Sequence, residues 1–142
     1  TFTIDTGWIK PLEASNLDDI QSHIDARLYR AMQEDHELEV GKNNLHAYRS
    51  YLHHYLLMKE QVSHEPYLFV RLLEHVAGGI RIQIQAFLTA TSMMAYEEEQ
   101  SLVTEHVLES ISWFGLRLYQ SPRGDSDDDE GVYDDDGNYI ID

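Results

Sequence analysis

The sequence has no cysteine, only three prolines, only three lysines and no long hydrophobic run. Without cysteine the chain has no disulfide, no thiolate nucleophile and no cysteine-ligated zinc or iron–sulfur site. No apolar run approaches the ~18–20 residues that span a bilayer, so no membrane segment is predicted. The first five residues, Thr1-Phe2-Thr3-Ile4-Asp5, lack the basic and hydrophobic regions of a secretory signal. The expected location is therefore cytoplasmic, or in the virion if the protein is viral.

Acidic charge is what the sequence has in excess. It contains 26 Asp and Glu residues against 10 Lys and Arg, a formal net charge of −16. Residues 1–120 and residues 121–142 each contribute −8. Such a surface repels phosphate, which excludes direct binding to nucleic acid or to an anionic membrane. The expected partner is a basic protein surface, on a nucleic-acid-binding protein or on a neighbouring subunit. A halophilic origin would also give an acidic, lysine-poor surface.

Apolar residues at helical spacing predict an all-α fold. We expect a bundle of four to five amphipathic helices over residues 1–120, followed by an acidic extended tail over residues 121–142. One helix is expected to start at Ser15 with Asp18 in its first turn, another after Asn43-Asn44, and a last one over residues 98–119. The expected core consists of Ile20, Ile24, Leu28, Leu52, Leu73, Val76, Ile84, Phe87, Val107, Ile111 and Phe114.

The segment from Phe69 to Leu88 is ambiguous. Its apolar residues keep a helical period, yet residues 80–85 (Ile-Arg-Ile-Gln-Ile-Gln) alternate as a strand would. We expect a helix, because no other segment of residues 1–120 offers a convincing partner strand. Gly78-Gly79 is then interpreted as a kink or a close helix–helix crossing.

The tail carries a repeated pattern of three aspartates followed by a tyrosine. Such a segment repels itself and cannot bury enough apolar surface to fold alone. A small hairpin around Asp136-Gly137 is a further expectation. We expect the acidic groups to face basic groups and the apolar ones to touch protein. These tail residues are Asp127, Asp128, Asp129, Glu130, Tyr133, Asp134, Asp135, Asp136, Tyr139, Ile140 and Ile141.

Eight histidines raise the question of a metal site. His46, His53, Glu60 and His64 share one face of the second helix, but most are two turns apart and cannot bind one ion. The Asp-rich tail does not fit the EF-hand spacing. No metal, cofactor or catalytic residue is therefore predicted, and Tyr48, Tyr51 and Tyr55 are interpreted as core.

The leading hypothesis is a non-enzymatic, acidic helical protein-interaction module that docks on a basic partner. One version is a nucleic-acid-mimicking inhibitor of the viral or immunity type. The predicted partner-binding residues are those of the tail together with Glu97, Glu98 and Glu99 on the last helix. An alternative is a structural subunit of a symmetric oligomer, such as a virion connector, with the tail packed on a neighbouring subunit. A metal-dependent helical enzyme is the third hypothesis.

Overall fold

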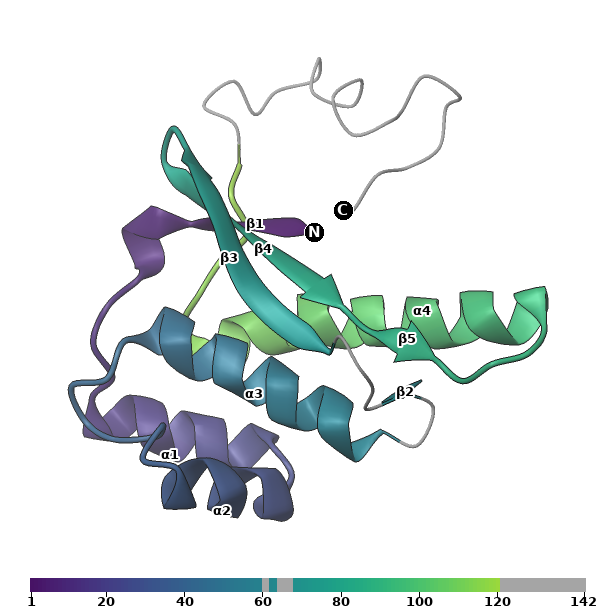
Figure 1. Ribbon diagram of the computed structural model, residues 1–142. Helices are drawn as coiled ribbons and strands as arrows, with labels where there is room; N and C mark the ends of the chain where they lie inside the picture. Colours follow the sequence, from purple (N-terminus) through teal and green to yellow (C-terminus); the bar gives the residue numbers. More distant parts are fainter. Residues whose placement is uncertain (60–61, 64–67, 121–142) are drawn as a thin grey trace.

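Four α-helices and two small antiparallel sheets make up the described part of the chain (Figure 1). The structure is a computed structural model that describes residues 1–59, 62–63 and 68–120. The three-stranded sheet lies on one side of α3, and α1 and α2 lie on the other. The elements are β1 (Phe2–Asp5), the 3-10 helix η1 (Thr6–Trp8), α1 (Ala14–His23), α2 (Ala26–Glu34), α3 (Asn44–Met58), β2 (Val62–Ser63), β3 (Phe69–Val76), β4 (Gly79–Gln85), β5 (Phe87–Leu88), α4 (Met93–Ser110) and the 3-10 helix η2 (Ile111–Phe114).

The sheet shows that the all-α prediction is wrong, because the fold is α+β. Its strand order is β1-β4-β3, with β4 in the centre. Ile80 and Ile82 alternate along β4 and are buried, as the period of two requires. Ile80 pairs with Ile4 of β1 and Ile82 with Leu72 of β3. The partner strands that the sequence did not reveal are thus a four-residue strand far away in the chain and the adjacent residues 69–76.

Gly78 and Gly79 lie at a hairpin turn and the start of β4, and not at a helix kink. Val76 pairs with Gly79, so the turn consists of Ala77 and Gly78, and Gly78 has a φ of +81° that glycine adopts without strain. A Cβ on Gly79 would lie 2.8 Å from the Thr3 methyl carbon and 3.0 Å from the Tyr119 ring. Glycine at this position therefore allows β1 and the Tyr119 side chain to pack against β4.

The helix expected over residues 69–88 is replaced by strands, whereas the other predicted helices exist with different ends. The first one splits at Asp25, whose carboxylate accepts a hydrogen bond from Arg27 N (2.7 Å) and starts α2. The N-cap of α1 is Glu13 and not Ser15, and the Asn16 side chain accepts a hydrogen bond from Glu13 N (2.8 Å). Asn43 caps α3 as expected, because its side chain accepts from Leu45 N and His46 N. α4 begins at Met93 and ends at Ser110, short of the predicted residue 119.

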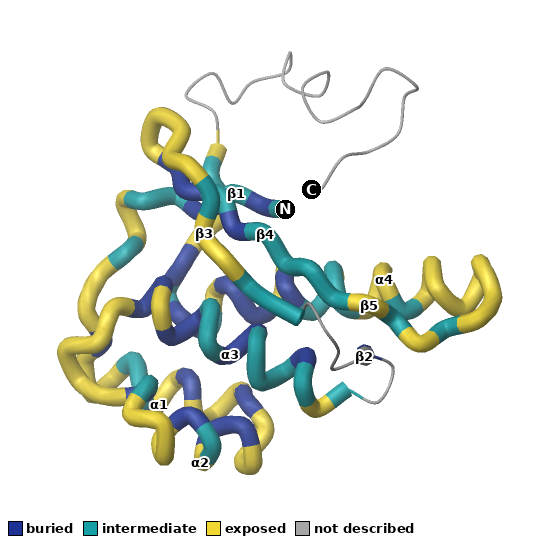
Figure 2. The backbone as a smooth tube through the Cα atoms, viewed as in Figure 1, coloured by how far each residue is buried: buried dark blue, intermediate teal, exposed yellow. Residues whose placement is uncertain are grey.

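The core lies between α3, the inner face of the sheet, η2 and the two short helices (Figure 2). Seven of the predicted core residues are buried: Ile20, Ile24, Leu28, Leu52, Val107, Ile111 and Phe114. The four that are not buried are Leu73, Val76, Ile84 and Phe87. All four lie on strands, where side chains alternate with a period of two and a helical period does not predict burial. Ile84 shares the inner face of β4 with Ile80 and Ile82 and is half-buried against the core.

Asn44 is a fully buried polar residue that ties three segments together. Its Oδ1 accepts from Lys10 N (2.9 Å), and its Nδ2 donates to Trp8 O (3.1 Å) and Phe114 O (3.0 Å). The segment after η2 then runs beside β1, where Tyr119 N donates to Thr3 O (2.8 Å). The chain thus passes from the helical core back to the edge of the sheet before residue 120.

Candidate protein-interaction surface

The N-terminal half of α4 projects from the rest of the molecule (Figures 1 and 2). Ser92 starts the helix by accepting a hydrogen bond from Ala95 N (3.1 Å). The side chains that follow find little to pack on: Met93 is 77% exposed, Met94 83% and Tyr96 43%. We call residues 93–102 the α4 arm. Its apolar side chains were not among the predicted site residues, although they directly precede the glutamates that were.

The α4 arm is also acidic. Glu97 and Glu98 are exposed, as the predicted docking site requires, whereas Glu99 is half-buried and its Oε2 has no hydrogen-bond partner within the described residues. Glu105 and Glu109 continue the acidic character along the helix. No lysine or arginine occurs between residues 82 and 116, so no cation on α4 offsets these charges. Exposed methionines and carboxylates thus occupy the same ten residues.

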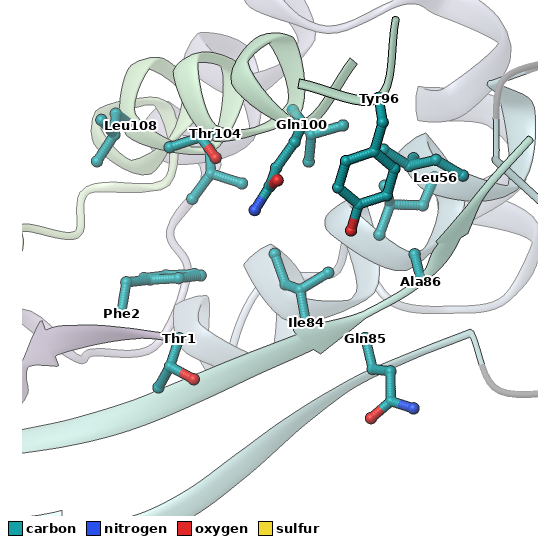
Figure 3. Close-up of a pocket in the computed structure, with 13 residues that line it drawn as sticks. Thr1, Phe2, Leu56, Ile84, Gln85, Ala86, Tyr96, Gln100, Thr104 and Leu108 are labelled. Carbon is teal, nitrogen blue, oxygen red and sulfur yellow. The ribbon is translucent and has the colours of Figure 1, made fainter. Parts of the chain in front are cut away.

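A groove runs between the α4 arm and strands β4 and β5 (Figure 3). Phe2, Ile84 and Leu56 form its apolar wall, and Tyr96 and Gln100 add polar groups from the helix. Its volume of about 270 Å³ lies just below the ~300–1,000 Å³ of pockets for small ligands. The groove therefore suits one or two apolar side chains of a protein partner better than a cofactor.

A cluster of aromatic and histidine side chains lies where α3 meets the C-terminal half of α4. Tyr51 Oη and His106 Nε2 are 2.6 Å apart, and the His106 ring stacks on Tyr55 with 4.0 Å between ring centroids. Burial raises the pKa of Tyr51 and Tyr48 well above the ordinary value of a phenol. Burial also lowers the pKa of His106. Both pKa shifts favour the neutral forms of Tyr48, Tyr51 and His106. Tyr48 and Tyr51 are buried core residues, as expected, and Tyr55 is half-buried.

The remaining predicted site residues are not brought together by the described part of the chain. The tail residues Asp127–Glu130, Tyr133–Asp136 and Tyr139–Ile141 lie outside the described residues. Glu60 and His64 of the histidine face also lie outside them. His46 and His53 lie on α3 and line a hollow beside Asp35 and Glu37. The proximity of these carboxylates to α3 was not visible in the sequence.

We found no protein-family model that matches this chain and no solved structure with significant similarity to it. Within residues 1–59, 62–63 and 68–120, no helix combines the length and apolar character needed to cross a bilayer.

Proposed function

We propose that this protein is a non-enzymatic interaction module that docks through the α4 arm on a basic protein surface. The observation that carries the proposal is the coincidence of highly exposed methionines with adjacent glutamates on one projecting helix. The tail would add further acidic contacts to the same kind of partner.

The apolar side chains argue for a protein partner. Burying a methionine side chain stabilises a complex by about 1.5–3 kcal/mol, and methionine adapts its shape to irregular surfaces. In the unbound protein Met93 and Met94 contribute almost none of this burial energy, because both are more than three-quarters exposed. A helix that presents such side chains beside a groove is a common form of protein recognition.

The charges argue for a basic partner and against a second copy of the same helix. Two α4 helices side by side would bring two sets of five glutamates together without a lysine or arginine on either. Like charges placed across an interface cost several kcal/mol, whereas opposite charges steer association and fix its register. A nucleic-acid-binding protein combines basic charge with apolar contact area, and we propose this partner class. The cytoplasm, or a virion, is the proposed place of the encounter.

Binding of the partner, purified from the source organism, tests the proposal. Glu97→Gln/Glu98→Gln should weaken the affinity of the full-length protein at least tenfold at low salt and reduce its dependence on sodium chloride. Asp18→Asn/Asp19→Asn removes the same charge from exposed positions of α1 and should leave the affinity nearly unchanged. Circular dichroism checks that both variants keep the wild-type fold.

Two results would count against the proposal. Equal weakening by the α4 and α1 variants would mean that net charge, and not the α4 arm, drives binding. A defined homo-oligomer in light scattering that is lost on substituting Met93 and Met94 would favour the structural-subunit alternative.

A further inference from the structure

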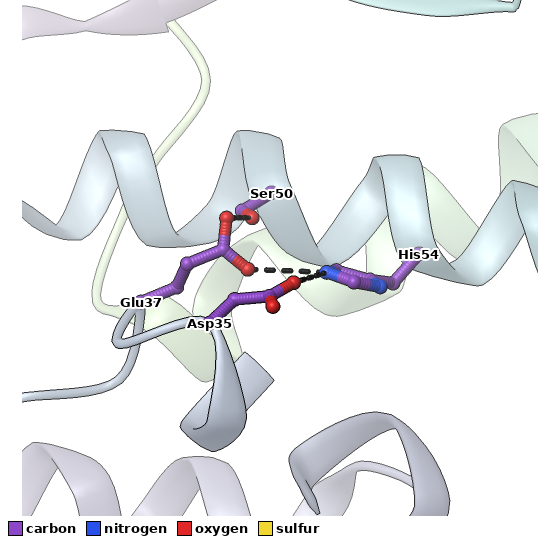
Figure 4. A network of polar contacts seen from close by, with 4 residues as sticks. All are labelled: Asp35, Glu37, Ser50 and His54. Atoms are coloured by element: carbon purple, nitrogen blue, oxygen red, sulfur yellow. Dashed lines mark hydrogen bonds and ion pairs between the residues drawn. The ribbon is translucent and has the colours of Figure 1, made fainter. Parts of the chain in front are cut away.

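A second cluster, on α3 and the connection before it, gathers three metal-ligating side chains (Figure 4). His54 Nε2 lies 3.1 Å from Glu37 Oε1 and 3.4 Å from Asp35 Oδ2. One ligand atom from each of the three residues lies within 4.8 Å of the other two. The cluster is separate from the α4 arm and plays no part in the proposed docking.

The chain builds this cluster through the way α2 ends. His36 adopts a left-handed conformation (φ 59°), with His36 N bonded to Gln33 O (3.0 Å) and Glu37 N to Met32 O (2.9 Å). This is a Schellman motif, which reverses the chain at a helix end. Asp35 and Glu37 flank the reversal, and both carboxylates reach the same imidazole on α3.

Glu37 is held in place by two side chains of α3. Ser50, one turn before His54 on α3, donates a hydrogen bond to Glu37 Oε2 and leaves Oε1 turned toward the imidazole (Figure 4). The side chains of His54 and Glu37 are only 19% and 20% exposed. A ligand carboxylate fixed by a hydroxyl donor is typical of metal sites in proteins, where such partners orient the ligands.

The two donor separations from His54 fit a tetrahedral ion, and the carboxylate oxygens of Asp35 and Glu37 lie within 4.8 Å of each other. Zinc binds nitrogen and carboxylate oxygen at about 2.0–2.2 Å, which places neighbouring ligand atoms about 3.3–3.6 Å apart in a tetrahedron. The two separations from His54 Nε2, 3.1 and 3.4 Å, lie close to this distance. We propose that Asp35, Glu37 and His54 bind a divalent cation of the zinc type, with the fourth position open to solvent.

The chemistry of the donors favours such an ion over calcium and over a simple ion pair. Calcium takes six to eight oxygen ligands, whereas one imidazole and two carboxylates suit zinc and its first-row neighbours. One imidazole N–H can satisfy one carboxylate oxygen well, yet two carboxylates face the same nitrogen here. Arg49 also lines the hollow, but lies within hydrogen-bonding distance of His46 (3.4 Å). A bound ion would fasten the α2–α3 connection to α3.

Cobalt(II) titration of the full-length protein tests the site, because tetrahedral cobalt absorbs visible light strongly and octahedral cobalt does not. We expect one saturable tetrahedral equivalent that zinc displaces. His54→Ala and Asp35→Asn should each lower the affinity more than tenfold. Ser50→Ala, which removes only the hydrogen bond to Glu37, should lower it about tenfold. Asp35 is the most exposed of the three, so its variant retains the fold even if His54→Ala does not.

His36→Asn is the matched control. His36 Nδ1 also lies 3.1 Å from a carboxylate, Glu39 Oε2, but it is not part of a three-ligand group within the described residues. Asparagine tolerates the left-handed backbone, so the affinity should stay unchanged. Absence of a tetrahedral signal in the wild type, or a signal that survives both His54→Ala and Asp35→Asn, would overturn the proposal. The first outcome would identify the cluster as an ion pair and the second as binding elsewhere, for instance by acidic tail residues.

Discussion

The two ends of α4 differ in almost every physical respect. At the C-terminal end Val107 and Ser110 are buried, and Tyr48 Oη on α3 donates to Val107 O (2.7 Å). At the N-terminal end Met93 and Met94 are exposed, and Ser92 is the capping residue. The C-terminal end thus belongs to the core, whereas the N-terminal end extends beyond it.

This contrast separates what the helix does for stability from what it offers to a partner. An isolated helix of about ten residues is marginal in water, so the α4 arm is helical chiefly because it continues an anchored helix. Its most exposed side chains, Met93 and Met94, can consequently change without much effect on folding. Apolar residues at positions that do not stabilise the fold are most simply explained by intermolecular contact.

The largest expected effect on stability comes from disrupting the packing around the buried C-terminal end of α4. Phe114 of η2 is 2% exposed and packs against the rings of Tyr48 and Tyr51. Phe114→Ala should lower the free energy of unfolding by about 3–5 kcal/mol, through lost burial and a cavity. Urea denaturation followed by circular dichroism measures this. A decrease in unfolding free energy of less than about 1 kcal/mol would show that the C-terminal end of α4 is not firmly anchored in the core.

A smaller effect on the free energy of unfolding, dependent on pH, is expected at His106 in the C-terminal half of α4. Burial holds the folded-state pKa of His106 below the ordinary value of 6.5. As pH falls through 6.5, the unfolded chain binds a proton that the folded chain does not, so stability decreases. The decrease stops growing below the folded-state pKa.

His106→Gln should therefore flatten the fall in unfolding free energy between pH 7 and pH 5.5. His53, whose pKa is also lowered chiefly by burial, is present in both proteins, so the difference between the two curves isolates His106. Parallel curves would mean that His106 is protonated equally readily in the folded and unfolded states.

The smallest effect on stability is expected in the α4 arm. Met93→Ser/Met94→Ser should change the free energy of unfolding by no more than about 0.5 kcal/mol, because both side chains are already in water. The same variant should weaken partner binding clearly. Val40→Ser is the control, since Val40 is 66% exposed but lies on the connection to α3. If the methionine variant and the Val40 variant bind the partner equally well, Met93 and Met94 do not contact the partner.

Helical segments with regular apolar spacing could be predicted from the sequence. Asn43 caps α3, and Ile20, Leu52 and Val107 are buried as their spacing indicated. The sheet could not be predicted in the same way, because the pairing of Phe2–Asp5 with β4 joins residues 74 to 80 positions apart. Local periodicity carries no information on such pairing, and the apolar residues of β3 fit a helix as well as a strand.

The candidate site was only partly visible in the sequence, for a related reason. Glu97 and Glu98 were identified from charge alone and are exposed. Met93 and Met94 were missed because an exposed and a buried methionine look the same in a sequence. Asp35, Glu37 and His54 were missed because only the left-handed turn at His36 brings the carboxylates to α3. The only local signal for this cluster was the i, i+4 spacing of Ser50 and His54, which places both side chains on the same face of α3.

The position of β1 has a consequence for the order in which the chain can fold during synthesis. β1 pairs with residues 79–82 on one side, and Ile4 pairs with Leu118 on the other. At roughly 5–20 residues per second, the ribosome needs on the order of ten seconds between making Ile4 and making Leu118. During that time the buried face of β1, formed by Phe2 and Ile4, lacks its complete surroundings. The helices α1 to α3 can form earlier from local contacts, so the edge of the sheet is the last part of the described fold to close.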